Sequence, residues 1–269
     1  MMPAVTRRAI LLATAGLAAP RLSTSIRAAA PIRIAAASDL QVVLPLIAAA
    51  FERDTGVASR LTFGSTGNFA RQIRQGAPFD VFLAADQRFV QDLARDGVIT
   101  AVGPVYARGR LVVIARAGTD FHKVILDPPD AIAGLASAYD RGAAFRIALA
   151  NPEHAPYGLR AIEVLTNRGV LDKLRPRLVY GENVAQAAQF VVTDAAAVGL
   201  VGSSLTYAPA LAGQLAVASI PADWHAPLDQ GLAILPRAGE PAQRFADFVL
   251  GDTARALFSG HGFDLPRRA

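Results

Sequence analysis

The chain has 269 residues, of which 52% are hydrophobic and 18% are charged, so it can bury a large core and is not globally disordered. It contains no cysteine, which excludes disulfides, thiolate metal sites, a cysteine nucleophile and a lipid-modified cysteine. The formal net charge is +5, and this charge favours a nucleic-acid partner only if it lies in the folded part of the chain.

The positive charge lies mostly in residues 1–30, which have the layout of an export signal. This segment carries four arginines and no acidic residue, so the remaining chain has a net charge of about +1 (5 minus 4). An apolar run from Ala9 to Ala19 follows Arg7 and Arg8, and it is too short to span a membrane. The sequence therefore predicts a twin-arginine type export signal and a nearly neutral periplasmic protein that binds no nucleic acid.

Short apolar runs alternate with helical patterns along the first half of the mature chain. Leu44, Ile47 and Phe51 recur at helical spacing, and Gly56 closes that helix. The expected strands are 32–37, 61–63, 80–85 and 110–115.

The same alternation continues in the second half. Pro156 is expected in the first turn of a helix that ends at Gly169. The expected strands are 146–150, 178–180, 196–201 and 228–235, and two helices follow them.

This β-α rhythm predicts two α/β halves, each built on a mostly parallel sheet flanked by helices. Strands near 110–115 and 229–235 are expected to cross between the halves, since no flexible linker separates them. The predicted first lobe is 31–109 plus 230–269, and the predicted second lobe is 110–229.

Four turns between a strand and a helix have one chemistry in common. They contain hydroxyls, glycines and helix N-termini but no lysine or arginine, and the nearest cation is Arg71, one turn inside its helix. Converging turns of this kind would hold a small anion by N–H and O–H groups alone. The turns are 37–39, 64–67, 151–158 and 181–184.

Catalytic and metal motifs are mostly missing. The two lysines, Lys123 and Lys173, do not follow a glycine, so there is no Walker loop, and the four histidines lack metal-ligand spacing. An exported hydrolase with Ser38 or Ser65 as nucleophile and His154 as base is the alternative from the enzyme class. The expected protein is not an enzyme and carries no cofactor.

Several of these segments resemble the periplasmic molybdate-binding proteins of ABC transporters, over about residues 32–264. The matching pieces include Ala-Ala-Ala-Ser38-Asp-Leu, Phe-Gly-Ser-Thr66-Gly, Asp-Val-Phe-Leu-Ala-Ala-Asp86 and Asn-Pro-Glu-His-Ala-Pro-Tyr157-Gly. The resemblance implies a two-lobed periplasmic-binding-protein fold of type II, with the ligand cleft between the lobes.

The resemblance also implies the ligand set. Ser38 matches a hydroxyl ligand of the first lobe, and Thr66, with Ser65 as its neighbour, matches the second hydroxyl. Tyr157 and Val184 match backbone donors of the second lobe. Some relatives use a tyrosine hydroxyl at the position of Gly202, so that ligand is missing here and Tyr157 is a candidate to replace it.

The expected function is therefore capture of molybdate or tungstate and its delivery to the membrane permease and ATPase of an ABC importer. The metal would be bound as an oxyanion, without direct bonds from protein to metal, and the protein is expected to be a monomer. A sulfate- or phosphate-binding protein is the alternative within the binding class. Phosphate carries a proton at neutral pH and would need an acceptor, for which Asp39 is the candidate.

Overall fold

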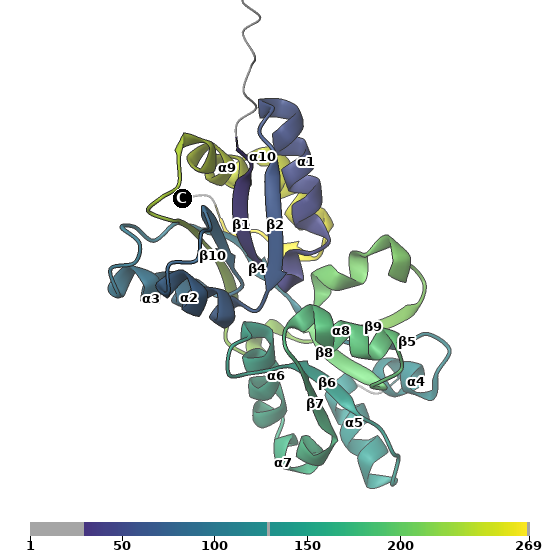
Figure 1. Ribbon diagram of the computed structural model, residues 1–269. Helices are drawn as coiled ribbons and strands as arrows, with labels where there is room; N and C mark the ends of the chain where they lie inside the picture. Colours follow the sequence, from purple (N-terminus) through teal and green to yellow (C-terminus); the bar gives the residue numbers. More distant parts are fainter. Residues whose placement is uncertain (1–29, 128–129, 268–269) are drawn as a thin grey trace, which may run out of the picture.

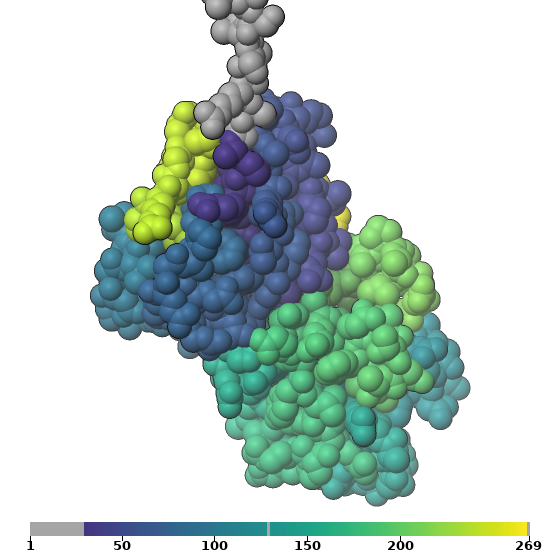
Figure 2. Space-filling model, viewed as in Figure 1, coloured from purple at the N-terminus to yellow at the C-terminus, as the bar shows by residue number. Residues whose placement is uncertain are grey.

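The computed structural model describes residues 30–127 and 130–267, and it divides into two α/β lobes (Figure 1). The predicted export signal falls outside this range, except for Ala30. Figure 2 shows the lobes packed against each other, with the second lobe offset below the first.

The first lobe is a six-stranded sheet in the order β11-β4-β10-β3-β1-β2 with helices on both faces. Its elements are β1 (Ile32–Ala37), a 3-10 turn η1 (Ser38–Leu40), α1 (Val43–Thr55), β2 (Ser59–Gly64), α2 (Thr66–Arg74), β3 (Val81–Ala84), α3 (Gln87–Arg95), β4 (Val105–Gly109), β10 (Leu228–Ile234), α9 (Glu240–Leu250), α10 (Asp252–Gly260) and β11 (Phe263–Asp264).

The second lobe is a five-stranded sheet in the order β7-β6-β8-β5-β9. Its elements are β5 (Leu111–Arg116), α4 (Asp120–Leu126), α5 (Ala131–Asp140), β6 (Ile147–Ala150), α6 (Pro156–Asn167), α7 (Leu171–Leu174), η2 (Arg175–Arg177), β7 (Leu178–Gly181), α8 (Val184–Val192), β8 (Val198–Gly202), η3 (Ser203–Tyr207), η4 (Pro209–Leu211), β9 (Leu215–Ser219) and η5 (Ala222–Trp224).

Most strands of each sheet run in one direction. In the first lobe β2, β1 and β3 pair in parallel, and β10 runs against both β3 and β4. In the second lobe β7, β6 and β8 pair in parallel, and β5 runs against both β8 and β9. The predicted fold class is confirmed, and the strands β5 and β10 that follow the two crossovers run against their neighbours.

Successive side chains of β1 point to opposite faces of the first sheet, and helices cover both faces. Ile34 and Ala36 pack with α1, α9 and α10 on one face, whereas Ala35 packs with α2 and α3 on the other. Helix α1 ends where Gly56 adopts a left-handed φ of 71° and its N–H donates to Glu52 O at 2.7 Å. At the carboxyl ends of β2 and β3 the chain continues directly into the N-termini of α2 and α3.

The chain passes between the sheets at Arg110 and again between β9 and β10. On this sheet membership we propose lobe boundaries near 109/110 and near 227/228. The second boundary falls two residues before the predicted one, because Leu228 and Asp229 already pair with β4.

Candidate functional site

The four polar turns meet at one small cavity between the lobes. Its volume is about 10 Å³, far below the roughly 300–1,000 Å³ that organic ligands usually occupy. No lysine or arginine is among the residues that line it, and all five predicted ligand residues are. The lining residues are Ala37, Ser38, Asp39, Gly64, Ser65, Thr66, Ala85, Ala155, Pro156, Tyr157, Asn183 and Val184.

Two hydroxyls from the first lobe retain a hydrogen to donate. Thr66 is 1% exposed, and its Oγ1 accepts a hydrogen bond from the Ala85 N–H at 3.1 Å. Ser38 is 2% exposed, and its Oγ accepts from the Ala185 N–H of the second lobe at 3.4 Å. Because each hydroxyl accepts in these contacts, its own hydrogen is available for an oxyanion.

The N-terminus of α6 leaves the N–H of Tyr157 unpaired in the described part of the chain. Pro156 has no N–H, and the N–H groups of Gly158 and Leu159 both donate to Ala155 O, at 3.0 and 3.2 Å. The remaining first-turn donor lies in the cavity wall, as a backbone ligand for an anion requires.

The same reasoning applies to α8. Asn183 caps this helix, and its Oδ1 accepts from the N–H groups of Ala185 and Gln186, both at 3.1 Å. Its carbonyl accepts from Ala187 at 3.1 Å. The first N–H of α8, that of Val184, has no acceptor among residues 30–127 and 130–267.

At α2 the first N–H belongs to Thr66, and it too has no acceptor within the described ranges. The Gly67 N–H donates across the lobe boundary to His154 O at 2.8 Å. A Cβ at Gly67 would lie 2.8 Å from that carbonyl oxygen, so the close approach of the lobes requires glycine here.

Ser65 differs from the other two hydroxyls because its oxygen contacts an imidazole. Ser65 Oγ lies 3.0 Å from His154 Nδ1, and His154 Nε2 lies 3.7 Å from Glu182 Oε2. The Glu182 carboxylate also accepts from the Asn68 side-chain amide of the first lobe. These contacts join the lobes beside the cavity. We therefore expect Ser65 to contribute more to holding the lobes together than to binding the ligand.

The arrangement of Ser65, His154 and Glu182 has the residue types of a hydrolase triad but not its geometry. In such a triad one imidazole nitrogen faces the nucleophile while the other donates to a buried carboxylate. Here the Glu182 side chain is 58% exposed and lies 3.7 Å from the ring. Ser38, the other candidate nucleophile, has no histidine among its hydrogen-bond partners within the described residues.

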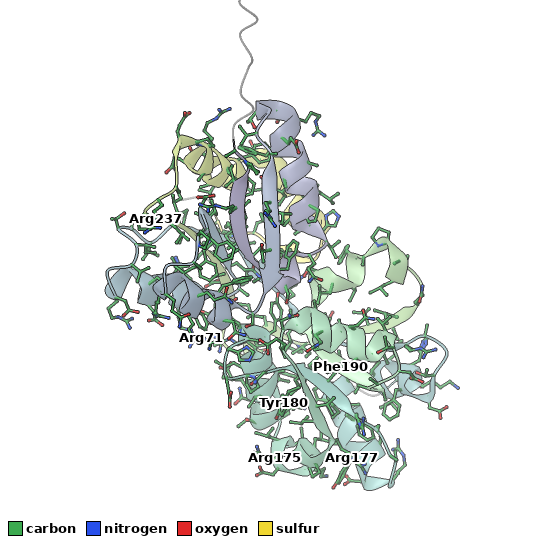
Figure 3. All side chains as sticks on the ribbon, in the orientation of Figure 1. Arg71, Arg175, Arg177, Tyr180, Phe190 and Arg237 are labelled. Atoms are coloured by element: carbon green, nitrogen blue, oxygen red, sulfur yellow. The ribbon has the colours of Figure 1, made fainter. Side chains whose placement is uncertain are left out.

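Arg71, the nearest cation in the sequence, lies outside the cavity. It is exposed near the lobe boundary (Figure 3), and its guanidinium donates to Asn68 Oδ1 at 2.6 Å. Glu153 and Glu182 are likewise absent from the cavity lining. The wall that faces an anion therefore consists of neutral donors and one acidic residue, Asp39.

Asp39 is fully buried in a network that sequence analysis did not find. Its Oδ2 accepts from the Tyr157 hydroxyl at 3.1 Å and from the Gln230 side-chain amide. The Tyr106 hydroxyl donates to Gln230 Oε1 at 2.7 Å, which orients the amide. Burial raises the pKa of Asp39 to about 6, and the hydrogen bonds from Gln230 and Tyr157 oppose that rise.

The Tyr157 hydroxyl is therefore engaged by Asp39, and the expectation that it replaces the missing tyrosine ligand needs correction. The Tyr157 ring covers Gly202, where an added Cβ would lie 3.1 Å from the ring. At Gly109 an added Cβ would overlap the Tyr157 hydroxyl. Tyr157 thus fills the space beside Gly202, and we expect its contribution to the cavity to be its backbone N–H.

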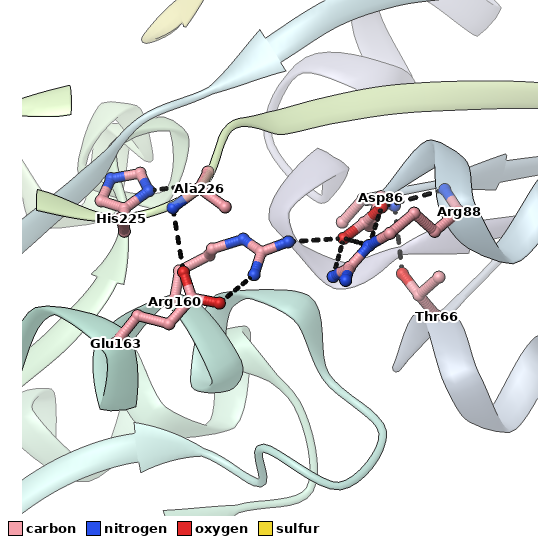
Figure 4. Close-up of polar contacts among 8 residues, drawn as sticks. Thr66, Asp86, Arg88, Arg160, Glu163, His225 and Ala226 are labelled. Atoms are coloured by element: carbon pink, nitrogen blue, oxygen red, sulfur yellow. Dashed lines mark hydrogen bonds and ion pairs between the residues drawn. The ribbon is translucent and has the colours of Figure 1, made fainter. Parts of the chain in front are cut away.

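A buried ion pair forms a second contact between the lobes (Figure 4). Arg160 of α6 is 2% exposed, and its guanidinium binds the Asp86 carboxylate at 2.9 Å. Asp86 caps α3 of the first lobe and also binds Arg88. Glu163 binds Arg160 and accepts from the Ala226 N–H at 2.9 Å, close to the second crossover.

Local patterns could not reveal this ion pair, because Asp86 and Arg160 are 74 positions apart and belong to different lobes. Two kinds of site are absent from residues 30–127 and 130–267. No group of three or more potential ligand side chains is placed to hold a metal ion. No helix there combines the length and apolar character that crossing a membrane requires.

Two α/β lobes that close around a small cavity of neutral donors define a solute-binding protein. The chain belongs to the bacterial extracellular solute-binding proteins, whose family model matches residues 32–264. The predicted resemblance is confirmed. As a member of this family, the chain is a solute-binding component of transport and not an enzyme, so the hydrolase alternative is not supported.

Three comparisons sharpen this assignment. The chain is 33% identical to the molybdate-binding protein ModA of Azotobacter vinelandii, over 88% of this chain and 91% of that protein. It is 31% identical to ModA of Escherichia coli, over 87% and 89% of the two chains. The solved periplasmic molybdate-binding protein of Azotobacter vinelandii superposes with a TM-score of 0.76 at 29% identity, covering 88% of this chain and all of that one.

Proposed function

We propose that this protein captures molybdate or tungstate between its lobes and delivers the anion to the permease and ATPase of an ABC importer. The observation that carries the proposal is the cavity itself, which gathers hydroxyls and unpaired N–H groups from both lobes without any lysine or arginine. The names of the relatives support molybdate as the ligand.

The proposed ligands are the hydroxyls of Ser38 and Thr66 and the N–H groups of Thr66, Tyr157 and Val184, with Ser65 as an auxiliary hydroxyl. Each hydrogen bond to a charged acceptor contributes about 1.5–3 kcal/mol. Five such bonds contribute on the order of 8–15 kcal/mol before ordering costs. Micromolar to nanomolar binding corresponds to about 8–12 kcal/mol, so neutral donors suffice to hold the anion.

The donors come from both lobes, so the anion can hold the closed conformation. Thr66 begins α2 of the first lobe, whereas Tyr157 and Val184 lie in the first turns of α6 and α8 of the second. The positive ends of three helix dipoles thus face the cavity. An open form would separate these donors and lose the binding free energy that they share.

Calorimetric titration with molybdate, tungstate, sulfate and phosphate at equal ionic strength tests this proposal. We expect tight binding of molybdate or tungstate, with one anion per chain and much weaker binding of sulfate and phosphate. Selective binding of sulfate or phosphate, or no binding of either metal oxyanion, would contradict the proposal.

The site of action and the assembly belong to the same proposal. Residues 1–30 are proposed to direct export to the periplasm by the twin-arginine route, where the protein acts as a monomer without a lipid anchor. Mass spectrometry of the exported protein and light scattering of the purified protein test these points. An uncleaved or acylated chain, or a stable dimer, would contradict them.

A further inference from the structure

Asp39 is a buried carboxyl group in the cavity wall that the proposed ligand set does not use. It follows the ligand Ser38 directly, in the turn η1 at the end of β1. Its Oδ2 accepts two hydrogen bonds, from Tyr157 and Gln230, but its Oδ1 is buried without any hydrogen-bond partner among the described residues. A buried carboxylate oxygen without a donor is costly, and this one lies in the wall of a proposed anion site.

No cation within residues 30–127 and 130–267 forms an ion pair with Asp39. Of the elements packed against η1, helix α8 carries no titratable group, while η3 carries Tyr207 and β2 carries Arg60, which is exposed. The elements that supply its hydrogen-bond partners carry Tyr106 and Arg108 on β4, Tyr157, Arg160 and Glu163 on α6, and Asp229 on β10.

Of the cations on these elements, Arg60 is exposed, and Arg108 and Arg160 are paired elsewhere. Arg108 binds Asp229 at 2.6 Å, and Arg160 binds Asp86 and Glu163. Burial and the Asp39 charge raise the pKa values of Tyr106 and Tyr157 well above normal, so both phenols stay neutral. Only neutral donors therefore oppose the desolvation of the Asp39 carboxylate.

Entry of a dianion would place two further negative charges beside this carboxylate. Repulsion between like charges in a buried site favours the neutral acid. Burial already raises the pKa of Asp39 to about 6 before any anion is bound. Near pH 7.5 the free protein would hold Asp39 mostly ionised, and the complex would hold it protonated.

We propose that a fully deprotonated dianion binds this cavity together with one proton, which Asp39 takes up from the solvent on Oδ1. The carboxylate and the proton form a neutral carboxylic acid, while Oδ2 keeps its hydrogen bonds from Tyr157 and Gln230. The proton thus takes the place of a balancing lysine or arginine. This inference rests on the proposed capture of molybdate or tungstate.

Proton uptake and its pH dependence test the inference directly. Molybdate is titrated into the wild-type protein at pH 7.5 in buffers of different ionisation enthalpy, and we expect uptake of close to one proton per anion. The Kd for molybdate, measured at pH 6.5, 7.5 and 8.5, is expected to rise by up to about tenfold per pH unit. Molybdate itself stays a dianion over this range.

The variant Asp39→Asn separates Asp39 from other titrating groups. Asparagine is neutral and of the same shape, so we expect this variant to bind molybdate without proton uptake and with a Kd independent of pH. The matched control is His154→Gln, which removes the imidazole next to Ser65 and is expected to keep the proton uptake.

The possible outcomes distinguish this inference from the proposed function. Molybdate binding by the wild type with no proton uptake and a flat pH profile overturns the inference and leaves the proposed function standing. Uptake that survives in Asp39→Asn but is lost in His154→Gln also overturns it. Absence of binding of molybdate and tungstate at every pH rejects the proposed function itself. The wild-type measurement decides the matter even if Asp39→Asn fails to fold.

Discussion

Two of the buried polar regions between the lobes, the Arg160–Asp86 ion pair and the cavity, differ in how charge is compensated. At the ion pair, Arg160 and Asp86 compensate each other inside the protein. At the cavity, the N–H groups of Tyr157 and Val184 have no acceptor within the described chain, so that contact is incomplete without an anion. The ion pair is complete within the protein, whereas the cavity, where Tyr157 already donates to Asp39 across the lobes, gains its remaining hydrogen bonds only when an anion is present.

The largest effect on molybdate affinity is expected from Arg160→Met, which removes the positive charge that compensates the buried Asp86 carboxylate. The variant leaves the buried Asp86 with Arg88 alone, whose side chain is 55% exposed. Removing one partner of a buried ion pair costs about 3–5 kcal/mol. Since the pair joins the lobes, this cost falls on the closed conformation, and calorimetry is expected to show molybdate affinity reduced by about two to four orders of magnitude.

The matched control for this variant is Arg95→Met. Arg95 pairs with Asp92 on the surface of α3, where its side chain is 73% exposed, and such pairs contribute about 0–1 kcal/mol. Equal affinity loss in the two variants would show that the buried pair does not hold the closed form.

The next largest effect is expected from Asp39→Asn on the stability of the anion-free protein. The folded-state pKa of Asp39 is about 6, against about 3.9 for an unfolded aspartate, so the folded state binds more protons between these values. Wild-type stability due to this group is therefore lost as pH rises from about 4 to about 6, on the order of 3 kcal/mol. Asparagine does not titrate, and the variant avoids that loss.

Urea unfolding of both proteins at pH 4.5, 5.5, 6.5 and 7.5 measures this difference. The stability of Asp39→Asn relative to wild type is expected to rise across the first three values and then level off. Parallel pH profiles for the two proteins would rule out a raised pKa at Asp39.

Ser38→Ala tests whether the Ser38 hydroxyl in the cavity binds the anion. This change removes one hydroxyl donor to a charged acceptor, a loss of about 1.5–3 kcal/mol, so molybdate affinity is expected to fall about tenfold to a hundredfold. Ser59→Ala is the control, because Ser59 Oγ is buried without a partner at the opposite end of β2. If Ser38→Ala binds molybdate as tightly as Ser59→Ala does, Ser38 is not a ligand.

The smallest effects are expected from two glycine variants, of which Gly109→Ala adds a methyl group behind the cavity wall. The added methyl group would overlap the Tyr157 hydroxyl and crowd Gln230 Nε2 at 3.2 Å. Such overpacking costs about 1–3 kcal/mol, and urea unfolding measures it. Gly202→Ala is expected to cost less, because its methyl would lie 3.1 Å from the Tyr157 ring.

Gly260→Ala serves as the control for both glycine variants. A Cβ at Gly260 has nothing within 4 Å, so the unfolding free energy is expected to stay the same or to increase slightly. If Gly109→Ala is as stable as Gly260→Ala, then the Tyr157 hydroxyl is not packed tightly against Gly109.

Much of the fold was accessible from local patterns. The short apolar run of β1, the spacing of Leu44, Ile47 and Phe51, and the end of α1 at Gly56 are local effects of burial and backbone geometry. The strands β4 and β9 were not predicted. Arg108 is exposed and interrupts the apolar residues of β4. The Leu-Ala-Val-Ala run of β9 is apolar, but Val217 within it is exposed, and local patterns did not mark this run as a strand.

The sequence by itself determined that two α/β halves end their strands in turns rich in hydroxyls and helix N-termini, because both features follow from residues close together in the chain. Only the tertiary structure decided which donors remain free, that Asp39 is buried against Tyr157 and Gln230, and that Arg160 meets Asp86. These facts depend on groups 74 to 191 positions apart, whose contact results from how the lobes pack and not from any local pattern.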